Sequence, residues 1–379
     1  MSNQLNKLPM IDDNQESTCR PDEQNTASFE DTGSANWITG QLETNAGPVY
    51  QVAAVLDRKD LTGSIKARLG LGRMDYIIPP GLYAVGNPEP TSPVLVSANY
   101  KLSFDQLRRE LAGLNLWILV LDTKGINVWC AAGKGSFSTA ELMRMVDATS
   151  LGEIVSHRTL ILPQLAAPGV SAHAMRKESG FKVVYGPVRA ADIPEFLSSN
   201  NKAEPEMRHP SFTLPDRLIL APIELVAMLK PALGLIGLFF LLNMAALLAD
   251  KSPIIFISLL RQSLMDFAPF FAAILIGIVL VPALLPYIPG RALAWKGWVL
   301  GVLWVLVYTV LITTSAGWLQ TAAYYLAIPA ITAFLGMNFT GSTTYTSLSG
   351  VVKEMSFALP AIILSASLGL IGLIAGYFI

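Results

Sequence analysis

The chain has 379 residues, 52% of them hydrophobic, and its 27 Lys and Arg residues nearly balance its 28 Asp and Glu residues. This balance excludes the basic excess typical of a nucleic-acid-binding protein, so no nucleic-acid partner is expected. The two cysteines, Cys19 and Cys130, are too few and too far apart for a disulfide framework.

Residues 1–45 are rich in Asn, Asp, Glu, Gln, Ser and Thr. Such a segment buries too little apolar surface to offset the entropy lost on ordering, so it is predicted to be a disordered polar tail in which Cys19 has no role. No basic region followed by an apolar stretch stands at the start, so no secretory signal is predicted. The polar half of the chain is therefore expected in the cytoplasm.

Residues 46–200 show the pattern of a compact α/β domain. Capping-box spacing predicts helices that open at Ser103 and Ser138, and further helices are expected from about Ser171 and over residues 190–197. Four short apolar runs predict strands over residues 94–97, 116–121, 159–162 and 181–185. Because strands and helices alternate, a parallel, Rossmann-like layered sheet is the expected fold, with ligands outside the carboxyl ends of the strands.

Residues 201–222 are polar and contain four prolines, which predicts a linker to a transmembrane domain over residues 223–379. Five apolar stretches are each long enough to cross a bilayer: residues 225–249, 267–289, 297–317, 319–339 and 356–379. With the α/β domain in the cytoplasm, inner flanks hold five basic residues and outer loops hold two. This bias predicts a multi-pass protein of the cytoplasmic (inner) membrane, with the amino terminus inside and the carboxyl terminus outside. Lys230 is the only charged residue within a predicted span, and it lies near the end of that span. Since charged residues inside the membrane usually mark ion or proton pathways, this argues against an ion-coupled transporter.

Cys130 lies in the stretch Asn127–Lys134, which follows the predicted strand over residues 116–121. A lone cysteine there is either a small buried hydrophobic residue or a thiolate ligand for a metal or cofactor. A nucleophilic cysteine with His157 or His173 as its base also remains open.

Several other sites are excluded by spacing. A phosphate-binding loop needs four residues between its glycines and Ser or Thr after Lys, whereas seven residues separate Gly125 from Gly133 and Gly135 follows Lys134. No histidine stands at zinc-ligand spacing to Cys130, and two cysteines cannot hold an iron–sulfur cluster.

Residues 123–135, Thr-Lys-Gly-Ile-Asn-Val-Trp-Cys-Ala-Ala-Gly-Lys-Gly, resemble the signature of the HgcA family, the corrinoid proteins of microbial mercury methylation. The likeness extends to Ser97–Tyr100, to Leu162–Val170 and to the five-span half. The corrinoid-binding domain of the acetyl-CoA-pathway corrinoid iron–sulfur protein has related residues. By the usual account it lacks a protein ligand to cobalt at this position.

The resemblance implies that residues 46–200 bind a cobalamin-type corrinoid, with Cys130 as the lower axial ligand of cobalt and the catalytic residue. A thiolate is a strong electron donor, and it would favour transfer of a methyl group from cobalt to an electrophile such as Hg(II). The implied corrinoid contacts are Thr123 and two stretches of the chain. The first stretch is Asn127, Val128, Trp129, Cys130, Ala131, Ala132, Gly133 and Lys134. The second is Gln164, Leu165, Ala166, Ala167, Pro168, Gly169 and Val170.

The implied activity is a membrane-anchored corrinoid methyltransferase that makes methylmercury. Its implied partners are a small dicluster [4Fe–4S] ferredoxin, HgcB, as reductant and a methyltransferase that supplies the methyl group by a methyl-folate route. One alternative is a membrane-bound corrinoid methyl carrier of acetyl-CoA-pathway one-carbon metabolism. Another is a membrane transporter or sensor that uses the thiol without a corrinoid.

Overall fold

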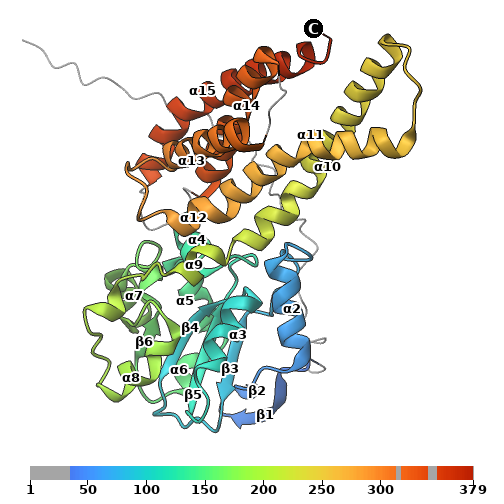
Figure 1. Cartoon of the computed structure of the whole chain (residues 1–379). Coiled ribbons are helices and arrows are strands. Elements are labelled where there is room, and N and C mark those ends of the chain that lie inside the picture. Colours follow the sequence, from blue (N-terminus) through green and yellow to red (C-terminus); the bar gives the residue numbers. More distant parts are fainter. Residues whose placement is uncertain (1–34, 313–316, 340–347, 379) are drawn as a thin grey trace, which may run out of the picture. The chain divides into compact units, whose positions relative to one another are not determined.

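The computed structural model describes residues 35–312, 317–339 and 348–378, and the chain divides into two compact units (Figure 1). Unit 1 comprises the residues up to Ala67 together with Gly72–His209, and unit 2 comprises Arg68–Leu71 and Pro210–Ile379. Residues 1–34 of the predicted tail lie outside the described residues.

A seven-stranded sheet forms the centre of unit 1, in the order β1-β2-β3-β5-β4-β6-β7. The strands are β1 (Ile38–Thr44), β2 (Gly47–Val52), β3 (Gly81–Val85), β4 (Val94–Ala98), β5 (Leu116–Leu121), β6 (Thr159–Leu162) and β7 (Lys182–Tyr185). The last four are the predicted strands, and they run parallel to one another as expected. Buried side chains, apolar except for Ser97, fill β4 and β5 along their whole length, as in a sheet covered on both faces.

The first three strands correct the prediction of a wholly parallel sheet. β3 runs antiparallel to β5, and β1 and β2 form an antiparallel hairpin, so the sheet is mixed. β1 also begins within residues 1–45, so the predicted tail is too long at its carboxyl end. Ordering of this polar stretch is explained by the backbone pairing with β2 and by the adjacent Trp37, which is buried in the core.

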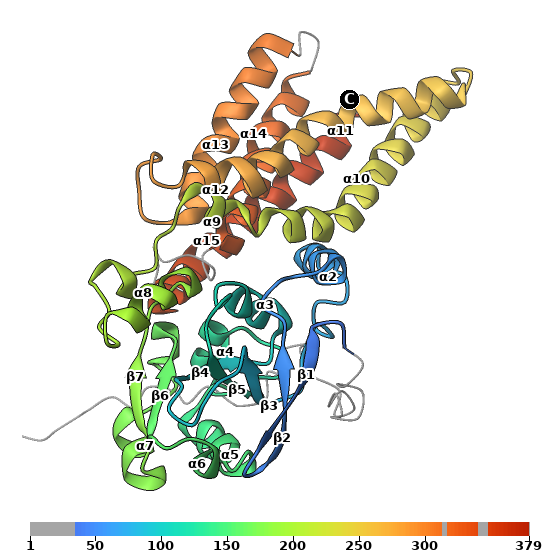
Figure 2. The same ribbon diagram turned by 90° about the horizontal axis from the view of Figure 1, so that it is seen from below.

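Helices cover both faces of the sheet (Figure 2). Phe104 and Leu111 after it pack on one face with Phe196, whereas Leu142 and Met175 pack on the other. The helices of unit 1 are α2 (Arg58–Arg68), α3 (Lys101–Arg109), α4 (Val128–Lys134), α5 (Thr139–Ala148), α6 (Leu151–Ile154), α7 (Ala172–Ser179) and α8 (Ile193–Ser198).

The two predicted capping boxes have different outcomes. The Ser138 side chain accepts a hydrogen bond from the Glu141 backbone N–H and caps α5, as predicted. The prediction for Ser103 is wrong, because α3 begins two residues earlier at Lys101, and Ser103 lies in its first turn.

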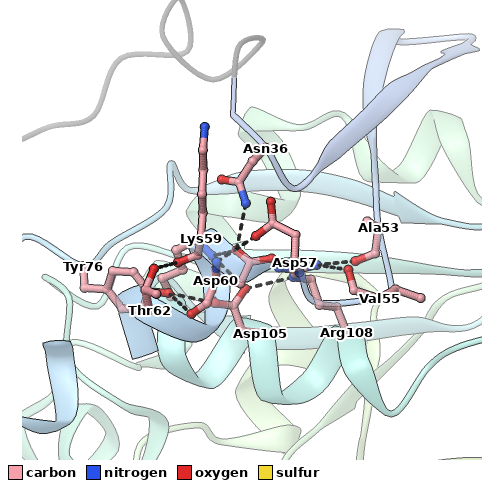
Figure 3. Close-up of polar contacts among 11 residues, drawn as sticks. Asn36, Ala53, Val55, Asp57, Lys59, Asp60, Thr62, Tyr76, Asp105 and Arg108 are labelled. Carbon is pink, nitrogen blue, oxygen red and sulfur yellow. Dashed lines mark hydrogen bonds and ion pairs between the residues drawn. The ribbon is translucent and has the colours of Figure 1, made fainter. Parts of the chain in front are cut away.

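A buried ion-pair cluster of Asp60, Lys101, Asp105 and Arg108 joins α2 to α3 (Figure 3). Lys101 Nζ lies 2.7 Å from oxygens of both carboxylates, and Arg108 Nη2 lies 2.6 Å from Asp60 Oδ2. Two cations balance two carboxylates, and each side chain has partners, which is what makes burial of four charges tolerable. The cluster therefore fixes the inner face of α2 against the sheet domain.

Unit 2 is helical. Its helices are α9 (Leu214–Leu218), α10 (Ala221–Ala249), α11 (Phe256–Leu275), α12 (Val281–Leu284), α13 (Leu293–Val307), α14 (Trp318–Asn338) and α15 (Leu348–Ala375), with π-helical turns at Ile276–Leu280 and Tyr308–Ile312. α14 packs against both α13 and α15. Glycines permit this approach, because a Cβ on Gly301 would lie 2.1 Å from Thr332 Oγ1 and one on Gly369 would lie 2.8 Å from Ala327 Cβ.

Among the described residues, five helical segments are long and apolar enough to cross a membrane, judged by length and composition: Leu214–Ala249, Phe256–Leu284, Leu293–Leu311, Trp318–Asn338 and Gly350–Ala375. This matches the predicted number. The first segment starts inside the predicted linker over residues 201–222, where α9 is held by hydrogen bonds from the Arg217 guanidinium to the Pro282 and Ala283 carbonyls.

The second segment corrects the prediction that only Lys230 lies within a span. α11 begins at Phe256, so Arg261 and Asp266 are helical residues of that segment. Asn243 Nδ2 and the Tyr377 hydroxyl donate to Asp266 Oδ2 at 2.7 and 2.6 Å. These hydrogen bonds join α10, α11 and the segment after α15, which accounts for a carboxylate in an otherwise apolar helix.

Candidate functional site

The segments predicted to form the site follow two parallel strands, β5 and β6, that flank β4, and both lie at the carboxyl ends of these strands. β5 lies on one side of β4 and β6 on the other, so the chain changes direction across the sheet between them. α4 follows β5, and the loop over residues 163–170 follows β6. A point where strand order reverses is where open α/β sheets bind their ligands, so both segments stand at the expected place.

Asn99, directly after β4, organises the turn that leads to α4. Its Oδ1 accepts hydrogen bonds from the Thr123 backbone N–H at 3.1 Å, the Thr123 hydroxyl at 2.8 Å and the Gly125 N–H at 3.0 Å. Its Nδ2 donates to Asp122 Oδ1 at 3.2 Å. Both Asn99 and Thr123 are buried, so this side chain substitutes for the backbone partners that the turn lacks.

The turn is held further by charge and by glycine. Burial raises the pKa of Asp122, but hydrogen bonds from the side chain and backbone of Lys124 outweigh it and keep the pKa below its usual range. Asp122 N–H donates to Glu141 Oε1 on α5 at 2.8 Å. Gly125 adopts φ of 69°, and a Cβ there would lie 2.7 Å from Ile77 Cγ2, so the position requires glycine.

α4 is a two-turn helix whose start is capped by Asn127. The Asn127 side chain accepts a hydrogen bond from the Cys130 backbone N–H at 2.9 Å, which fixes the cysteine directly. Ala131 and Ala132 are buried in the core, while Trp129, Cys130, Gly133 and Lys134 are exposed and Val128 is half-buried. The Cys130 thiol therefore lies on the side of α4 away from the core.

The loop after β6 packs closely on α4. It begins with a short 3-10 turn, Gln164–Ala166, and ends at Val170, whose carbonyl accepts a hydrogen bond from the Tyr185 hydroxyl. A Cβ on Gly169 would lie 2.1 Å from the Phe137 carbonyl oxygen and 3.0 Å from Ala132 Cα. This contact brings together the two stretches that the sequence predicts to act together.

Individual members of the loop lie in different environments. Ala166 and Val170 are buried and pack in the core, Gln164 and Leu165 are half-buried, and Ala167 and Pro168 are exposed. The Gln164 side-chain oxygen accepts a hydrogen bond from Arg208 at 3.0 Å. Only part of the predicted stretch is therefore exposed and available to a ligand, because its buried residues pack in the core.

The structure resolves two of the alternatives for Cys130. It is exposed, so the interpretation as a buried hydrophobic residue is wrong. His157 precedes β6 at the opposite edge of the sheet and is bonded to the Ser92 carbonyl and the Thr159 N–H, so it is not a base for this thiol. Within the described residues, no three His, Cys, Asp or Glu side chains are grouped as a metal site, and no hydrogen bond links Cys130 to His173.

Two further features follow Cys130 in the chain, at the end of α4. Ser136 Oγ is the single buried side-chain oxygen or nitrogen without a hydrogen-bond partner in the part of the chain that the structure describes. A Cβ placed on Gly133 or Gly135 would meet no atom within 4 Å. Open space thus adjoins the carboxyl-terminal turn of α4, whereas the Ser136 hydroxyl is enclosed by protein.

Sequence reasoning did not assign roles to Asn99, Asp122 and Glu141, which hold the turn before α4. Asn99 carried a usable signal, because a polar side chain directly after an apolar strand marks the ligand edge of a parallel sheet. Glu141 was predicted only as a capping residue, and its additional bond to Asp122 depends on the tertiary fold.

Comparisons with known proteins find relatives of unit 1. Residues 76–197 match the family described as the CO dehydrogenase/acetyl-CoA synthase delta subunit. The gamma subunit of the acetyl-CoA decarbonylase/synthase complex from Archaeoglobus fulgidus is 33% identical over 125 residues, which are 32% of this chain and 26% of that protein. The corresponding subunits of Methanopyrus kandleri and Methanocaldococcus jannaschii are 32% and 31% identical over 122 and 130 residues, 32% and 34% of this chain and 26% of each relative.

The chain thus spans about a quarter of the length of these relatives. The family match runs from the segment before β3 to α8 and includes β4, α4 and the loop after β6. It does not include β1, β2, α2 or any of the five long apolar segments. The similarity is therefore confined to the part of unit 1 that carries the candidate site.

Proposed function

We propose that unit 1 binds a corrinoid at the carboxyl edge of β5, β4 and β6 and acts as a membrane-anchored methyl carrier. The observation that carries the proposal is the exposed Cys130 thiol on α4, at the strand-order reversal and within the segment similar to acetyl-CoA synthase subunits. When bound, a corrinoid supplies a cobalt atom that can accept a methyl group and pass it on.

The residues present fit such a group. Cys130 offers a soft thiolate donor, which suits a transition metal, and no other described side chain competes for it by hydrogen bonding. The space beside Gly133 leaves room for the edge of a large cofactor. Trp129 adds an exposed aromatic surface next to the thiol.

Each part of the chain has a role in this proposal. Cys130 would hold the cobalt of a bound corrinoid through its thiolate, and Asn127 holds the cysteine backbone so that the thiolate would keep one position. Thr123 and the turn before α4 set the helix on the sheet, while Ala131 and Ala132 anchor it in the core. Gln164–Val170 forms the second wall of the site, and its exposed residues Ala167 and Pro168 are the direct contacts we expect.

The membrane part of the proposal rests on the five long apolar segments. We place the chain in the inner membrane as a multi-pass protein with unit 1 in the cytoplasm. Because the relatives are acetyl-CoA decarbonylase/synthase subunits, the leading acceptor is a one-carbon pathway partner. We propose a methyl-folate-dependent methyltransferase as the methyl donor.

Mercury methylation is the second candidate, and one observation favours it. The thiol at position 130 is exposed, and as a thiolate on cobalt it would donate electron density, which suits methyl transfer to an electrophile such as the substrate Hg(II). The five apolar segments also lie outside the match to the acetyl-CoA proteins. In this case turnover needs an external reductant such as the dicluster [4Fe–4S] ferredoxin HgcB, because the described residues provide no cluster of ligands for an iron–sulfur centre.

A methyl-acceptor comparison distinguishes the two candidates. Full-length protein loaded with methylated corrinoid is offered Hg(II), a low-molecular-weight thiol, or the methyl-accepting partner of an acetyl-CoA synthase system. The leading proposal predicts transfer to that partner at a rate well above the rate with Hg(II). Rapid methylmercury formation, abolished in Cys130→Ala and without transfer to the partner, would replace it with the second candidate.

A further inference from the structure

The outward face of α2 carries positive charge and apolar side chains together. Arg58, Lys59 and Lys66 are exposed, and Leu61 and Ile65 between them are 52% and 58% exposed. At 100° per residue these five side chains fall on one side of the helix, with the two apolar residues one turn apart. We call these five residues the basic face of α2.

The buried ion-pair cluster determines the charge of this face. Asp60 turns inward to Lys101 and Arg108, and burial raises its pKa, but the hydrogen bonds from those two side chains outweigh burial and lower the pKa to about 2. Its charge is thus matched inside the fold. In Figure 3 the Lys59 side chain extends away from the cluster that holds Asp60.

One exposed carboxylate, Asp57, remains at the start of the helix, where its Oδ1 accepts the Asp60 N–H at 2.8 Å. Three exposed cations against this one carboxylate leave an excess of positive charge on the outer surface of α2. None of the ion pairs between described residues uses Arg58, Lys59 or Lys66. Their charges are therefore available to an external partner.

Two more large apolar side chains of unit 1 adjoin the helix in sequence, Val55 at 77% and Met74 at 57% exposure. Isolated apolar side chains on a surface are ordinary, but Leu61 and Ile65 stand one turn apart on a helix face that also carries three cations, which gives this face a mixed character. Long basic side chains beside apolar ones suit the boundary between lipid headgroups and acyl chains.

We propose that the basic face of α2 rests on an anionic bilayer surface and binds phospholipid headgroups there. The bilayer is within reach, because four residues, Pro210–Thr213, separate unit 1 from the first segment long enough to span, and four residues extend about 14 Å at most. The cytoplasmic leaflet, on the side where we place unit 1, carries the negative surface potential that attracts basic segments.

Lipid is favoured over an acidic protein by the form of the surface. The cations lie on a convex helix and are spread along it, with Arg58 and Lys59 before the Leu61–Ile65 pair and Lys66 after it. Mobile headgroups rearrange to meet such charges, whereas a protein partner must present carboxylates at matching positions. The inference extends beyond the proposed function, since it requires no corrinoid and no particular methyl acceptor.

The test uses full-length protein in nanodiscs of phosphatidylcholine alone or mixed equally with phosphatidylglycerol. Hydrogen–deuterium exchange of peptides that cover α2 is expected to be about tenfold slower in the anionic discs. This is the effect expected when one to two basic side chains are attracted to anionic headgroups. Lys59→Glu/Lys66→Glu is expected to abolish the difference between the two lipids. Arg176→Glu/Lys177→Glu, which reverses two exposed cations on α7, is the matched control and should leave it unchanged.

Equal exchange of α2 in both lipids for the wild-type protein would overturn the proposal, and this arm does not depend on the folding of any variant. Protection that persists in Lys59→Glu/Lys66→Glu would also overturn it, because the cations would then be irrelevant. Protection that appears only when an acidic protein partner is added would assign the face to that partner instead. Incorporation of the chain into the discs separately tests the membrane part of the proposed function.

Discussion

At the scale of single residues, the site depends on buried polar groups that each serve several partners. Asn99 satisfies three donors of the turn before α4 with one oxygen, and Asp60 accepts from two cations. Such groups stabilise the fold only while every partner is present, because an orphaned buried donor or charge costs its full desolvation free energy.

For Asn99→Ala we expect a loss of about 2–4 kcal/mol in the free energy of unfolding, because buried N–H groups of Thr123 and Gly125 lose their acceptor. Urea titration of the full chain in detergent measures this loss. Asn115→Ala is the matched control, since Asn115 accepts one exposed bond from the Asn87 N–H, and about 1 kcal/mol or less is expected. Equal losses in the two variants would contradict the role assigned to Asn99.

Asp60 predicts an acid dependence of stability. Its pKa of about 2 in the folded chain lies below the value of 3.8 for a free aspartate, so the folded state binds fewer protons. The resulting stabilisation, on the order of 2 kcal/mol, is complete above about pH 5 and is lost as the pH falls through 4 towards 2.

Unfolding of the full chain followed at pH 6, 4 and 3 checks this dependence. Asp60→Asn is expected to be less stable at pH 6, because Lys101 and Arg108 keep their charges in a buried site, and to lose less stability on acidification. A parallel decline of both proteins between pH 6 and pH 3 would exclude Asp60 as the titrating group.

At the scale of elements, prediction succeeded where the hydrophobic pattern alone decides. β4 and β5 are runs of buried residues, apolar except for Ser97, and their lengths and parallel pairing follow from that. β1 was missed because its residues alternate between half-buried and exposed and most are polar, so its order depends on pairing with β2. The start of α11 was missed because Arg261 and Asp266 interrupt the apolar pattern, while tertiary hydrogen bonds hold Asp266 in place.

The contact between α4 and the loop after β6 was likewise not readable from the sequence, although both segments were named. Position along the chain indicated one edge of the sheet, whereas the close approach at Gly169 depends on how Phe137 and Ala132 are oriented. The inward orientation of Ala131, Ala132, Ala166 and Val170 could not be predicted for the same reason. The resemblance to a known motif identified residues 127–134 and 164–170, but it did not distinguish the residues that pack in the core from those that are exposed.

Two glycine variants separate packing from cofactor binding. In Gly169→Ala the new methyl group would overlap the Phe137 carbonyl, so the loop must move from α4, and we expect a loss of about 1–3 kcal/mol in stability. Gly133→Ala meets no protein atom and favours the helix by up to about 1 kcal/mol, so its apo stability is expected to equal or exceed that of the wild type.

The affinity for a corrinoid is the second property to measure for Gly133→Ala. Gly133→Ala is expected to weaken binding by about tenfold, a loss of roughly 1.4 kcal/mol, because the methyl group enters the open space beside Cys130. Equilibrium titration with a corrinoid, followed by absorbance, measures it. Unchanged affinity in Gly133→Ala would show that this side of α4 does not face the cofactor.

At the scale of the whole molecule, the chain joins a sheet domain, in which residues 76–197 are similar to a CO dehydrogenase/acetyl-CoA synthase subunit, to five long apolar helical segments. The positions of basic residues predict how these segments cross the membrane. Arg217, Lys230, Arg291, Lys296 and Lys353 fall on the predicted inner side, against Lys251 and Arg261 on the outer side.

Reporter fusions test this orientation. Alkaline phosphatase joined after residue 379 is expected to be active, because five crossings place that point outside, and a fusion in the connection after α12, at residue 290, is expected to be inactive. Green fluorescent protein at the same two points should give the reverse pattern. Fluorescence after residue 379 together with phosphatase activity at residue 290 would contradict the orientation and move unit 1 to the outside.

The central claim is that the Cys130 thiolate holds a corrinoid on α4, and the visible absorbance spectrum of the reconstituted full-length protein tests it most directly. Wild-type protein and Cys130→Ala are each loaded with the same corrinoid without oxygen, and cobalt analysis confirms equal occupancy. We expect the main corrin bands to shift between the two proteins, because a sulfur donor to cobalt is present in one and absent in the other. Superimposable spectra at equal occupancy would contradict thiolate ligation, and absence of corrinoid from both would contradict the proposed function itself.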